Sequence, residues 1–320
     1  MKKRIAAFAV VLGFVTVCLS IPCVAEPSRE TGNNAALQYY SAFLQMKDAD
    51  LSEADVKELG EIIAGSRPYD DGKFGKLVES NAQAVETMMV GAELPDCDWG
   101  FATLAKRFGA ETPVPYFWRS RALGRLDILF VLRAWSKGDL EKAVHALSSG
   151  MLYAKHVAIG GPLLPVLIAK MLLVQQLSIT SRLVDSGKLT SGQRETLRAA
   201  LAELDTFGPY WQAAINTEMG NMHANLDQIR AAPDQRQYYK SMFGNDAPPD
   251  FHITQQDYTD VGKVAAAYAK LFHDDNAAPV QSAISAATKT VQMMIANPER
   301  LVKSKQELQK ALEETKAKLR

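Results

Sequence analysis

Apolar residues recur at intervals of three and four positions along most of the chain, and this spacing predicts α-helices. A half-buried strand would instead alternate apolar and polar residues and would be rich in β-branched side chains. No segment keeps such an alternation. The sequence therefore predicts an all-α protein of about a dozen helices, packed mostly as antiparallel hairpins. These hairpins are expected to form either a tetratricopeptide-like array or an irregular α-bundle or solenoid.

The first helix is expected to begin after Asn33 or Asn34, because an asparagine side chain can accept a hydrogen bond from the first helical turn. Four residues at helical spacing form its expected apolar face: Leu37, Tyr40, Phe43 and Leu44. Further along the chain, the same spacing predicts one uninterrupted helix at about 74–90 and another at about 278–296.

Two long helices are expected at the centre of the protein, at 116–137 and 163–184. Residues 126–135 are apolar on most sides of the first helix, and the second helix is the most apolar part of the chain beyond residue 25. A helix that is apolar all round is buried in a core or spans a membrane. Lys170 and two glutamines interrupt the second helix, and they favour burial in a core.

The N-terminus has the three zones of a signal peptide. Three positive residues at 2–4 precede an apolar run at 5–19, and small residues lead to Ala25. We therefore predict that residues 1–25 are removed and that the protein is exported across the inner membrane, to become periplasmic or secreted. An uncleaved anchor is the alternative, but the run is shorter than the roughly 20 residues that span a bilayer. Lipid attachment at Cys18 or Cys23 is disfavoured, because no small residue precedes either one.

The mature chain is expected to have three parts. They are a flexible segment at 26–33, a helical domain at 34–297 and an amphipathic helix at 298–320. Within the helical domain, the candidate positions for a boundary are near residue 206 and at 244–252. Four leucines mark the apolar stripe of the last helix: Leu301, Leu308, Leu312 and Leu319. Lys305 and Thr315 interrupt its heptads, so we expect this helix to pack on the body or, alternatively, to offer a partner a narrow stripe.

Charge and cysteine content narrow the possible functions. Removing the three positive residues of the signal peptide leaves 33 Lys and Arg against 36 Asp and Glu, a net charge of −3. This balance gives no electrostatic reason to expect nucleic acid as a partner. Only Cys97 remains in the mature chain, and we expect this thiol to be buried. No phosphate-binding loop, dinucleotide fingerprint or nucleophile elbow is present, and no cofactor is expected.

Residues 121–158 resemble a tetratricopeptide-type helical hairpin. Leu123 and Gly124 lie in its first helix, Gly138-Asp139 forms the turn, and a set of small and bulky residues follows: Ala143, Leu147 and Gly150. In such a hairpin the small side chains let the two helices approach closely. The resemblance implies a helical surface that binds a protein or peptide.

The chain also resembles a group of exported all-helical proteins from planctomycete-type bacteria. The resemblance rests on residues 33–40 (NNAALQYY), residues 97–100 (CDWG) and the Gly138-Asp139 turn, and would extend over most of the mature chain. It implies the same all-helical fold and brings no catalytic residues with it.

Asp96, Cys97, Asp98 and Trp99 form the most unusual cluster in the sequence. Two carboxylates could form the corner of a metal site, but no histidine is close in sequence. The alternative is a structural turn, in which the Asp side chains bond to backbone N–H groups and Trp99 anchors the loop in the core. We favour the turn, and no metal ligand is assigned.

Arg119, Arg121 and Arg125 lie at the start of a central helix, and the last two share one helix face. They could bind an anionic ligand such as a carboxylate. Alternatively, they pair with Asp96, Asp98 or other carboxylates of the protein. The candidate binding residues are therefore Asp96, Asp98, Trp99 and these three arginines.

Three functions remain compatible with the sequence. We favour a non-catalytic binding or scaffolding protein that uses a helical-hairpin surface. The second is a metal-assisted hydrolase that uses Asp96, Asp98 and a distant histidine. The third is a helical bundle that holds an apolar ligand among methionines, which pack adaptably. The candidate methionines are Met88, Met89, Met219, Met222, Met293 and Met294.

Overall fold

The computed structural model describes residues 33–108, 112, 116–243 and 247–320. The predicted signal peptide and residues 26–32 of the predicted flexible segment lie outside the described residues. The described part of the chain is all-helical and holds no strand, which confirms the predicted fold class. Residues Asn34–Arg320 form one compact unit.

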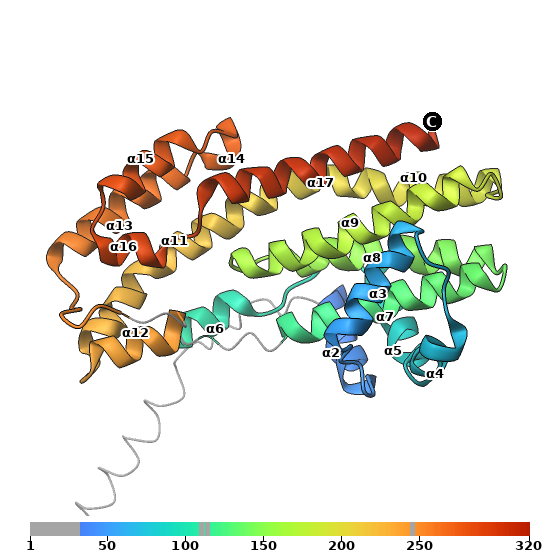
Figure 1. Ribbon diagram of the computed structural model, residues 1–320, viewed down its shortest axis with the longest axis horizontal. Helices are drawn as coiled ribbons and strands as arrows, with labels where there is room; N and C mark the ends of the chain where they lie inside the picture. The colour runs from blue at the N-terminus through green and yellow to red at the C-terminus, as the bar shows by residue number, and fades with distance from the viewer. Residues whose placement is uncertain (1–32, 109–111, 113–115, 244–246) are drawn as a thin grey trace, which may run out of the picture. The chain divides into compact units, whose positions relative to one another are not determined.

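Three long helices form the centre of this unit: α7 (Tyr116–Ser136), α8 (Leu140–Val157) and α9 (Leu163–Asp185) (Figure 1). Helices α7 and α8 form the predicted hairpin. Gly138 turns the chain with a φ of 80°, and the Asp139 side chain caps α8 by accepting a hydrogen bond from the Lys142 N–H. Helix α9 then packs on both α7 and α8.

Two glycines let these three helices approach closely. A Cβ atom added at Gly124 of α7 would lie 2.5 Å from Leu172 of α9. A Cβ at Gly150 of α8 would overlap the Asp127 carboxylate of α7 and lie 2.5 Å from the Gln176 Nε2 of α9. The expected role of small residues in the hairpin is therefore seen in the packing, and it extends to the third helix.

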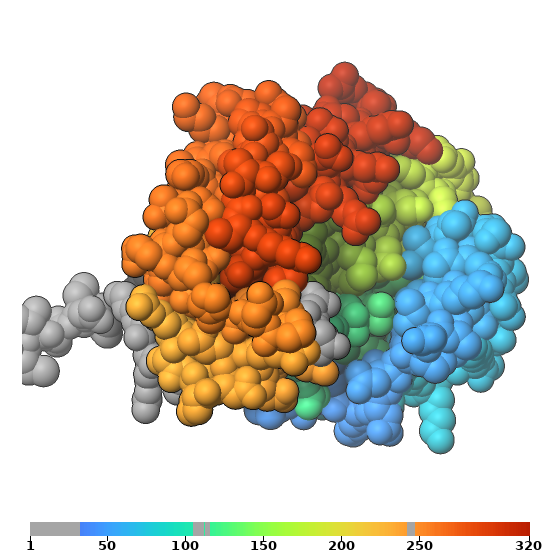
Figure 2. Space-filling view, turned by 60° about the vertical axis from the view of Figure 1, so that its left-hand side comes forward, coloured from blue at the N-terminus to red at the C-terminus, as the bar shows by residue number. Residues whose placement is uncertain are grey.

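Within the described residues, five helices precede the centre: α2 (Ala35–Gln45), α3 (Glu53–Ala64), α4 (Asp71–Ser80), α5 (Ala82–Ala92) and α6 (Phe101–Phe108). Helix α5 packs on α2, α7 and α8, whereas α3 packs on α9. In Figure 2 the blue surface of α2 and α3 lies beside green central segments, and the orange and red surface of the C-terminal helices lies on the other side. The central helices are thus covered from both ends of the chain.

The predicted apolar face of the first helix is partly wrong. Leu37 is 50% exposed and Leu44 is 89% exposed. Four residues with smaller or ring side chains are instead fully buried: Ala35, Ala36, Tyr39 and Ala42. The reason is close packing on α5, where a Cβ at Gly91 would lie 2.7 Å from the Tyr39 ring. Alanines permit this approach, so the larger leucines face outward.

The single helix predicted at 74–90 is also wrong, because Asn81 divides it into α4 and α5. The buried Asn81 amide accepts a hydrogen bond from the Lys47 N–H at 2.7 Å and donates to the Lys47 carbonyl at 2.8 Å. These bonds hold the loop after α2 against the break. A contact between residues 34 positions apart leaves no periodic signal in the sequence.

The second half of the chain contains α10 (Ser191–Glu203), the 3-10 turn η3 (Leu204–Phe207), α11 (Gly208–Ala231), α12 (Gln235–Phe243), α13 (Gln255–Tyr268), α14 (Leu271–Asp274), α15 (Ala278–Ala286), α16 (Lys289–Met294) and α17 (Pro298–Leu319). Helix α11 packs on α9 and carries α12, α13 and α14. Capping boxes begin α10 at Thr190 and α13 at Thr254.

The helix predicted at 278–296 is divided into α15 and α16. Thr288 lies at the break and caps α16. Its N–H donates to Asp260 at 2.9 Å, and its hydroxyl donates to the buried Asp257 at 2.5 Å. Both aspartates belong to α13, so a tertiary contact interrupts the helix at this point.

Helix α17 packs on the body, which is the first of the two outcomes predicted for it. It lies against α9 and α10 and buries Leu301, Leu308, Leu312 and Leu319. Thr315 is also buried and lies 3.2 Å from the Ser181 hydroxyl of α9.

Among the described helices, α9 is the one long and apolar enough to cross a membrane by length and composition. In the structure, 61% of its apolar window is buried against the rest of the protein. This degree of burial is typical of a core helix.

A carboxyl group lies at the centre of the three-helix packing. Asp127 is fully buried, and its partner in the described structure is the Gln176 Nε2, which lies 3.3 Å from Oδ2. Its other oxygen has no hydrogen-bond partner among the residues that the structure describes. Burial raises the pKa of Asp127 from 3.8 to about 8, so the group is protonated at neutral pH.

We predict that Gly150→Ala destabilises the protein by about 1–3 kcal/mol, because the added methyl group has no room between Asp127 and Gln176. Gly220→Ala is the matched control, since Gly220 is exposed on α11 and a Cβ there meets open space. That change should leave stability unchanged or raise it by up to about 1 kcal/mol. Urea unfolding of both variants tests this, and equal stabilities would contradict the close packing.

We predict that Asp127→Asn changes the pH dependence of stability. Between about pH 4 and pH 8, unfolded wild-type chain has released the Asp127 proton while folded protein keeps it. As the pH rises, wild-type stability should therefore fall by about 1.4 kcal/mol per pH unit relative to the variant, which has no proton to release. Unfolding free energies measured in urea across this range give the comparison. A difference between the two proteins that does not change with pH would refute the buried neutral acid.

Candidate functional site

The loop that carries the unusual Asp96–Trp99 cluster is fastened to the start of α2. The Ala35 N–H donates to the Asp96 carbonyl at 2.8 Å, which forms an isolated bridge between Asn34 and Asp96. The Asn34 side chain caps α2 and also bonds to both the N–H and the carbonyl of Asp98, at 2.8 and 2.9 Å. One asparagine therefore caps a helix and holds the distant loop.

Trp99, the last residue of this cluster, points into the core and is 4% exposed. Its indole N–H donates to the His156 carbonyl at 2.8 Å. Its ring stacks on Tyr116 with centroids 4.5 Å apart, and lies parallel to Phe43 at 6.2 Å. Trp99 thus joins α2, α7 and α8, as expected for an anchoring residue.

The side chain of His156 is buried in the same cluster. Its Nδ1 lies 2.6 Å from the Tyr39 hydroxyl, and Tyr39 stacks on Trp99 at 5.6 Å. Burial lowers the pKa of His156 from 6.5 to about 4, and the nearby Lys155 ammonium acts in the same direction. Burial also raises the pKa of Tyr39. Both groups are therefore neutral at ordinary pH and support the packing of α2 on α8.

Above this cluster the surface is hollowed between the end of α2 and the start of α7. A hollow of about 350 Å³ is lined by Tyr40, Phe43, Leu44, Met46, Tyr116 and Arg119. A second hollow of about 450 Å³ is lined by Met46, Asp48, Ala49, Asp50, Trp118, Arg119 and Ala122. The two share Met46 and Arg119, and together they form what we call the α2–α7 groove.

The α2–α7 groove has an aromatic floor and an exposed apolar rim. Phe43 and Tyr116 are almost fully buried in the floor, whereas Leu44 on the rim is 89% exposed and Trp118 is 61% exposed. The described lining of the two hollows consists of aromatic, aliphatic, arginine and aspartate side chains.

The three candidate arginines lie in or beside this groove. Arg119 lines both hollows and donates to the Phe43 carbonyl at 3.3 Å. Arg121 stacks over Trp118, 4.6 Å from the ring centroid. Burial, together with the like charge of Arg121, lowers the pKa of Arg125.

None of these three arginines forms an ion pair with a described carboxylate. Arg133, near the other end of α7, differs because it binds both Asp71 and Glu79. The expected alternative, in which Arg119, Arg121 and Arg125 pair with Asp96 or Asp98, is therefore not seen within the described residues. Arg119 and Arg121 place positive charge at the groove.

Asp98 takes the structural role expected for a turn, since its Oδ1 accepts the Gly100 N–H at 2.9 Å. Asp96 contributes its backbone carbonyl to the bridge with α2. Cys97 is buried, as predicted, and burial together with the Asp98 charge raises the pKa of its thiol. The loop therefore positions α2 and Trp99 below the α2–α7 groove.

No group of three His, Cys, Asp or Glu side chains that could hold a metal ion occurs among the described residues. The imidazole of His156 bonds to Tyr39, and that of His145 lies 3.5 Å from Glu93. The histidine that the metal-assisted hydrolase would require next to Asp96 and Asp98 is therefore not found in this part of the structure.

The candidate methionines belong to the general core. Four of them are buried, Met88, Met219, Met222 and Met294, and Met89 and Met293 pack against the core from partly buried positions. None lines the two hollows of the α2–α7 groove.

Most residues that line the groove were not predicted from the sequence. Leu44, Tyr40 and Phe43 were assigned to a buried face, and Trp118 was not singled out. The available signal was the neighbouring sequence of α7, in which Trp118 directly precedes Arg119 and stands three residues before Arg121. An aromatic residue directly followed by arginines at a helix start is typical of a recognition surface.

Comparisons with protein-family models, with curated proteins and with solved structures find no match to this chain.

We predict that acid weakens the fold through His156. Below pH 6.5 the unfolded chain binds a proton at this residue, whereas the folded protein stays neutral down to about pH 4. Relative to His156→Asn, whose Oδ1 can accept the Tyr39 hydrogen bond, wild-type protein should lose about 1.4 kcal/mol per pH unit between 6.5 and 4. Thermal unfolding at several pH values compares the two slopes. Parallel slopes would show that His156 is accessible to protons in the folded state.

Proposed function

We propose that this protein is a non-catalytic exported binding protein, and that its α2–α7 groove holds a segment of a partner polypeptide. The segment carries apolar or aromatic side chains and at least one carboxylate. The observation that supports this most is an aromatic groove beside three arginines that have no described carboxylate partner.

The apolar part of the segment would lie on Tyr40, Phe43 and Tyr116. These rings are held from below by Trp99, so little side-chain freedom remains to be lost when a ligand binds. Leu44 and Trp118 would be removed from water at the same time. Burial of exposed apolar area supplies the affinity in this arrangement.

The carboxylate would approach Arg119 or Arg121. A guanidinium group binds a carboxylate through two parallel hydrogen bonds, which a lysine cannot reproduce. Arg121 already lies flat on Trp118 and is therefore partly ordered. The acidic residues Asp48 and Asp50 line the second hollow, so an acidic segment is expected to place its carboxylate away from them.

The test uses a fluorescein-labelled peptide of alternating phenylalanine and glutamate, with glutamine and lysine versions as comparisons. The purified protein should bind the glutamate peptide at least about tenfold more tightly than the glutamine peptide, and the lysine peptide most weakly. Added salt should reduce the difference, because the arginines are at the surface.

Variants connect this binding to the groove. Arg119→Gln, Arg121→Gln and Leu44→Ser should each weaken binding of the glutamate peptide by about five- to tenfold or more. Val90→Ser and Arg194→Gln are the matched controls, since Val90 is also exposed and neither residue lines the groove. Equal affinity for all three peptides, or equal loss in groove and control variants, would reject the proposal.

A further inference from the structure

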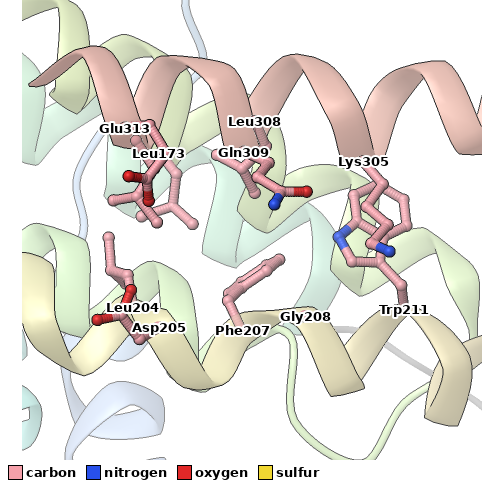
Figure 3. A pocket seen from close by; sticks show the side chains of 11 residues that line it. Leu173, Leu204, Asp205, Phe207, Gly208, Trp211, Lys305, Leu308, Gln309 and Glu313 are labelled. Carbon is pink, nitrogen blue, oxygen red and sulfur yellow. The ribbon is translucent and has the colours of Figure 1, made fainter. Parts of the chain in front are cut away.

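A separate pocket lies against α17, and its lining comes from residues 173–313, whereas the α2–α7 groove is lined by residues 40–122. Its volume is about 270 Å³, and its lining comes from α9, the η3–α11 segment and α17 (Figure 3). We call it the α17 pocket. Its size is just below the usual range for ligand sites, so it suits a molecule of about ten non-hydrogen atoms.

The inner wall of the α17 pocket is apolar and rigid. It is formed by Leu173, Leu204, Phe207, Trp211, Leu308 and Leu312. Each of these side chains is at most 9% exposed, so the core already holds them in place. The candidate methionines do not line it. The pocket is therefore preformed and suits an aliphatic or aromatic body.

The two ends of the pocket carry different charges. Figure 3 shows Asp205 and Glu313 at one end, and Lys305 and Trp211 at the other. Lys305 is neutralised, because its ammonium bonds to Asp275 at 2.7 Å and to the Phe272 carbonyl at 2.9 Å. It therefore offers little attraction to an anion.

The acidic end keeps an excess of negative charge. Asp205 and Glu313 share one ammonium group, that of Lys316, which bonds to Asp205 and lies 3.5 Å from Glu313. Two carboxylates against one cation leave about one negative charge beside the apolar wall. A protonated amine at this end would complete the charge balance.

We propose that the α17 pocket binds a small organic cation, in which an aliphatic or aromatic body carries one protonated amine. The body lies against Phe207, Trp211 and the leucines, and the amine lies at the acidic end, beside the Asp205 and Glu313 carboxylates that share the Lys316 ammonium. This site is independent of the α2–α7 groove, since the two share no lining residue.

Gly208 provides a way to close the pocket without disturbing the core. It lines the pocket at the start of α11, is exposed, and a Cβ added there meets open space. Gly208→Leu should therefore fold normally and place a side chain at the pocket mouth. Gly220→Leu is the matched control, because Gly220 lies on the same helix, is equally open and does not line the pocket.

Isothermal titration of the purified protein with 2-phenylethylamine, 2-phenylethanol and 3-phenylpropionate tests the proposal. The amine should bind with a Kd of about 1 mM or below and at least about tenfold more tightly than the alcohol, with the carboxylate weakest. Gly208→Leu should weaken amine binding at least about tenfold, whereas Gly220→Leu should not.

A second pair of variants tests the role of charge. Asp205→Asn and Glu313→Gln are surface changes that should each reduce the preference for the amine over the alcohol. The proposal is overturned if none of the three compounds binds at millimolar concentration, if amine and alcohol bind equally, or if Gly208→Leu binds as Gly220→Leu does.

Discussion

The close approach of α7, α8 and α9 is the constraint on which the rest of the structure depends. Gly124 and Gly150 bring the three helices together, and Asp127 and Gln176 occupy the space that Gly150 leaves between them. A buried carboxyl group with a single described partner is costly, and here it is tolerated by remaining protonated. Seven helices then pack directly on these three: α2, α3, α4, α5, α10, α11 and α17.

This central packing also determines where the α2–α7 groove lies. The Tyr153 hydroxyl of α8 donates to the Ser120 carbonyl of α7, and His156 of the same helix bonds to Tyr39 of α2 and to Trp99 of the 96–99 loop. The start of α7 is thereby held beside the end of α2. The arginines of α7 and the aromatic residues of α2 meet at the surface as a consequence.

The fold followed from the sequence wherever the decisive interactions were local. The Gly138-Asp139 turn and the largely apolar, buried α9 were predicted correctly, because each depends on residues within one or two helical turns. The breaks at Asn81 and Thr288 were missed, since both are caused by hydrogen bonds to residues far away in sequence.

The candidate site was predictable only in part for the same reason. The arginines at the start of α7 were identified from their spacing, and burial of Cys97 was expected. The orientation of α2 was not, because periodicity alone cannot distinguish a face of alanines packed against Gly91 from a face of leucines. Because the alanine face of α2 packs on α5, Leu44 is left exposed and lines the groove. A site formed by such a face can be identified only from the tertiary structure.

Hydrogen–deuterium exchange in the presence of the phenylalanine–glutamate peptide is the sharpest test of peptide binding in the α2–α7 groove. It locates the bound segment without relying on substitutions. We expect slower amide exchange at residues 40–50 and 116–122, and unchanged exchange in the helices around the α17 pocket. Slower exchange confined to other parts of the chain, or no change anywhere at a saturating peptide concentration, would contradict it.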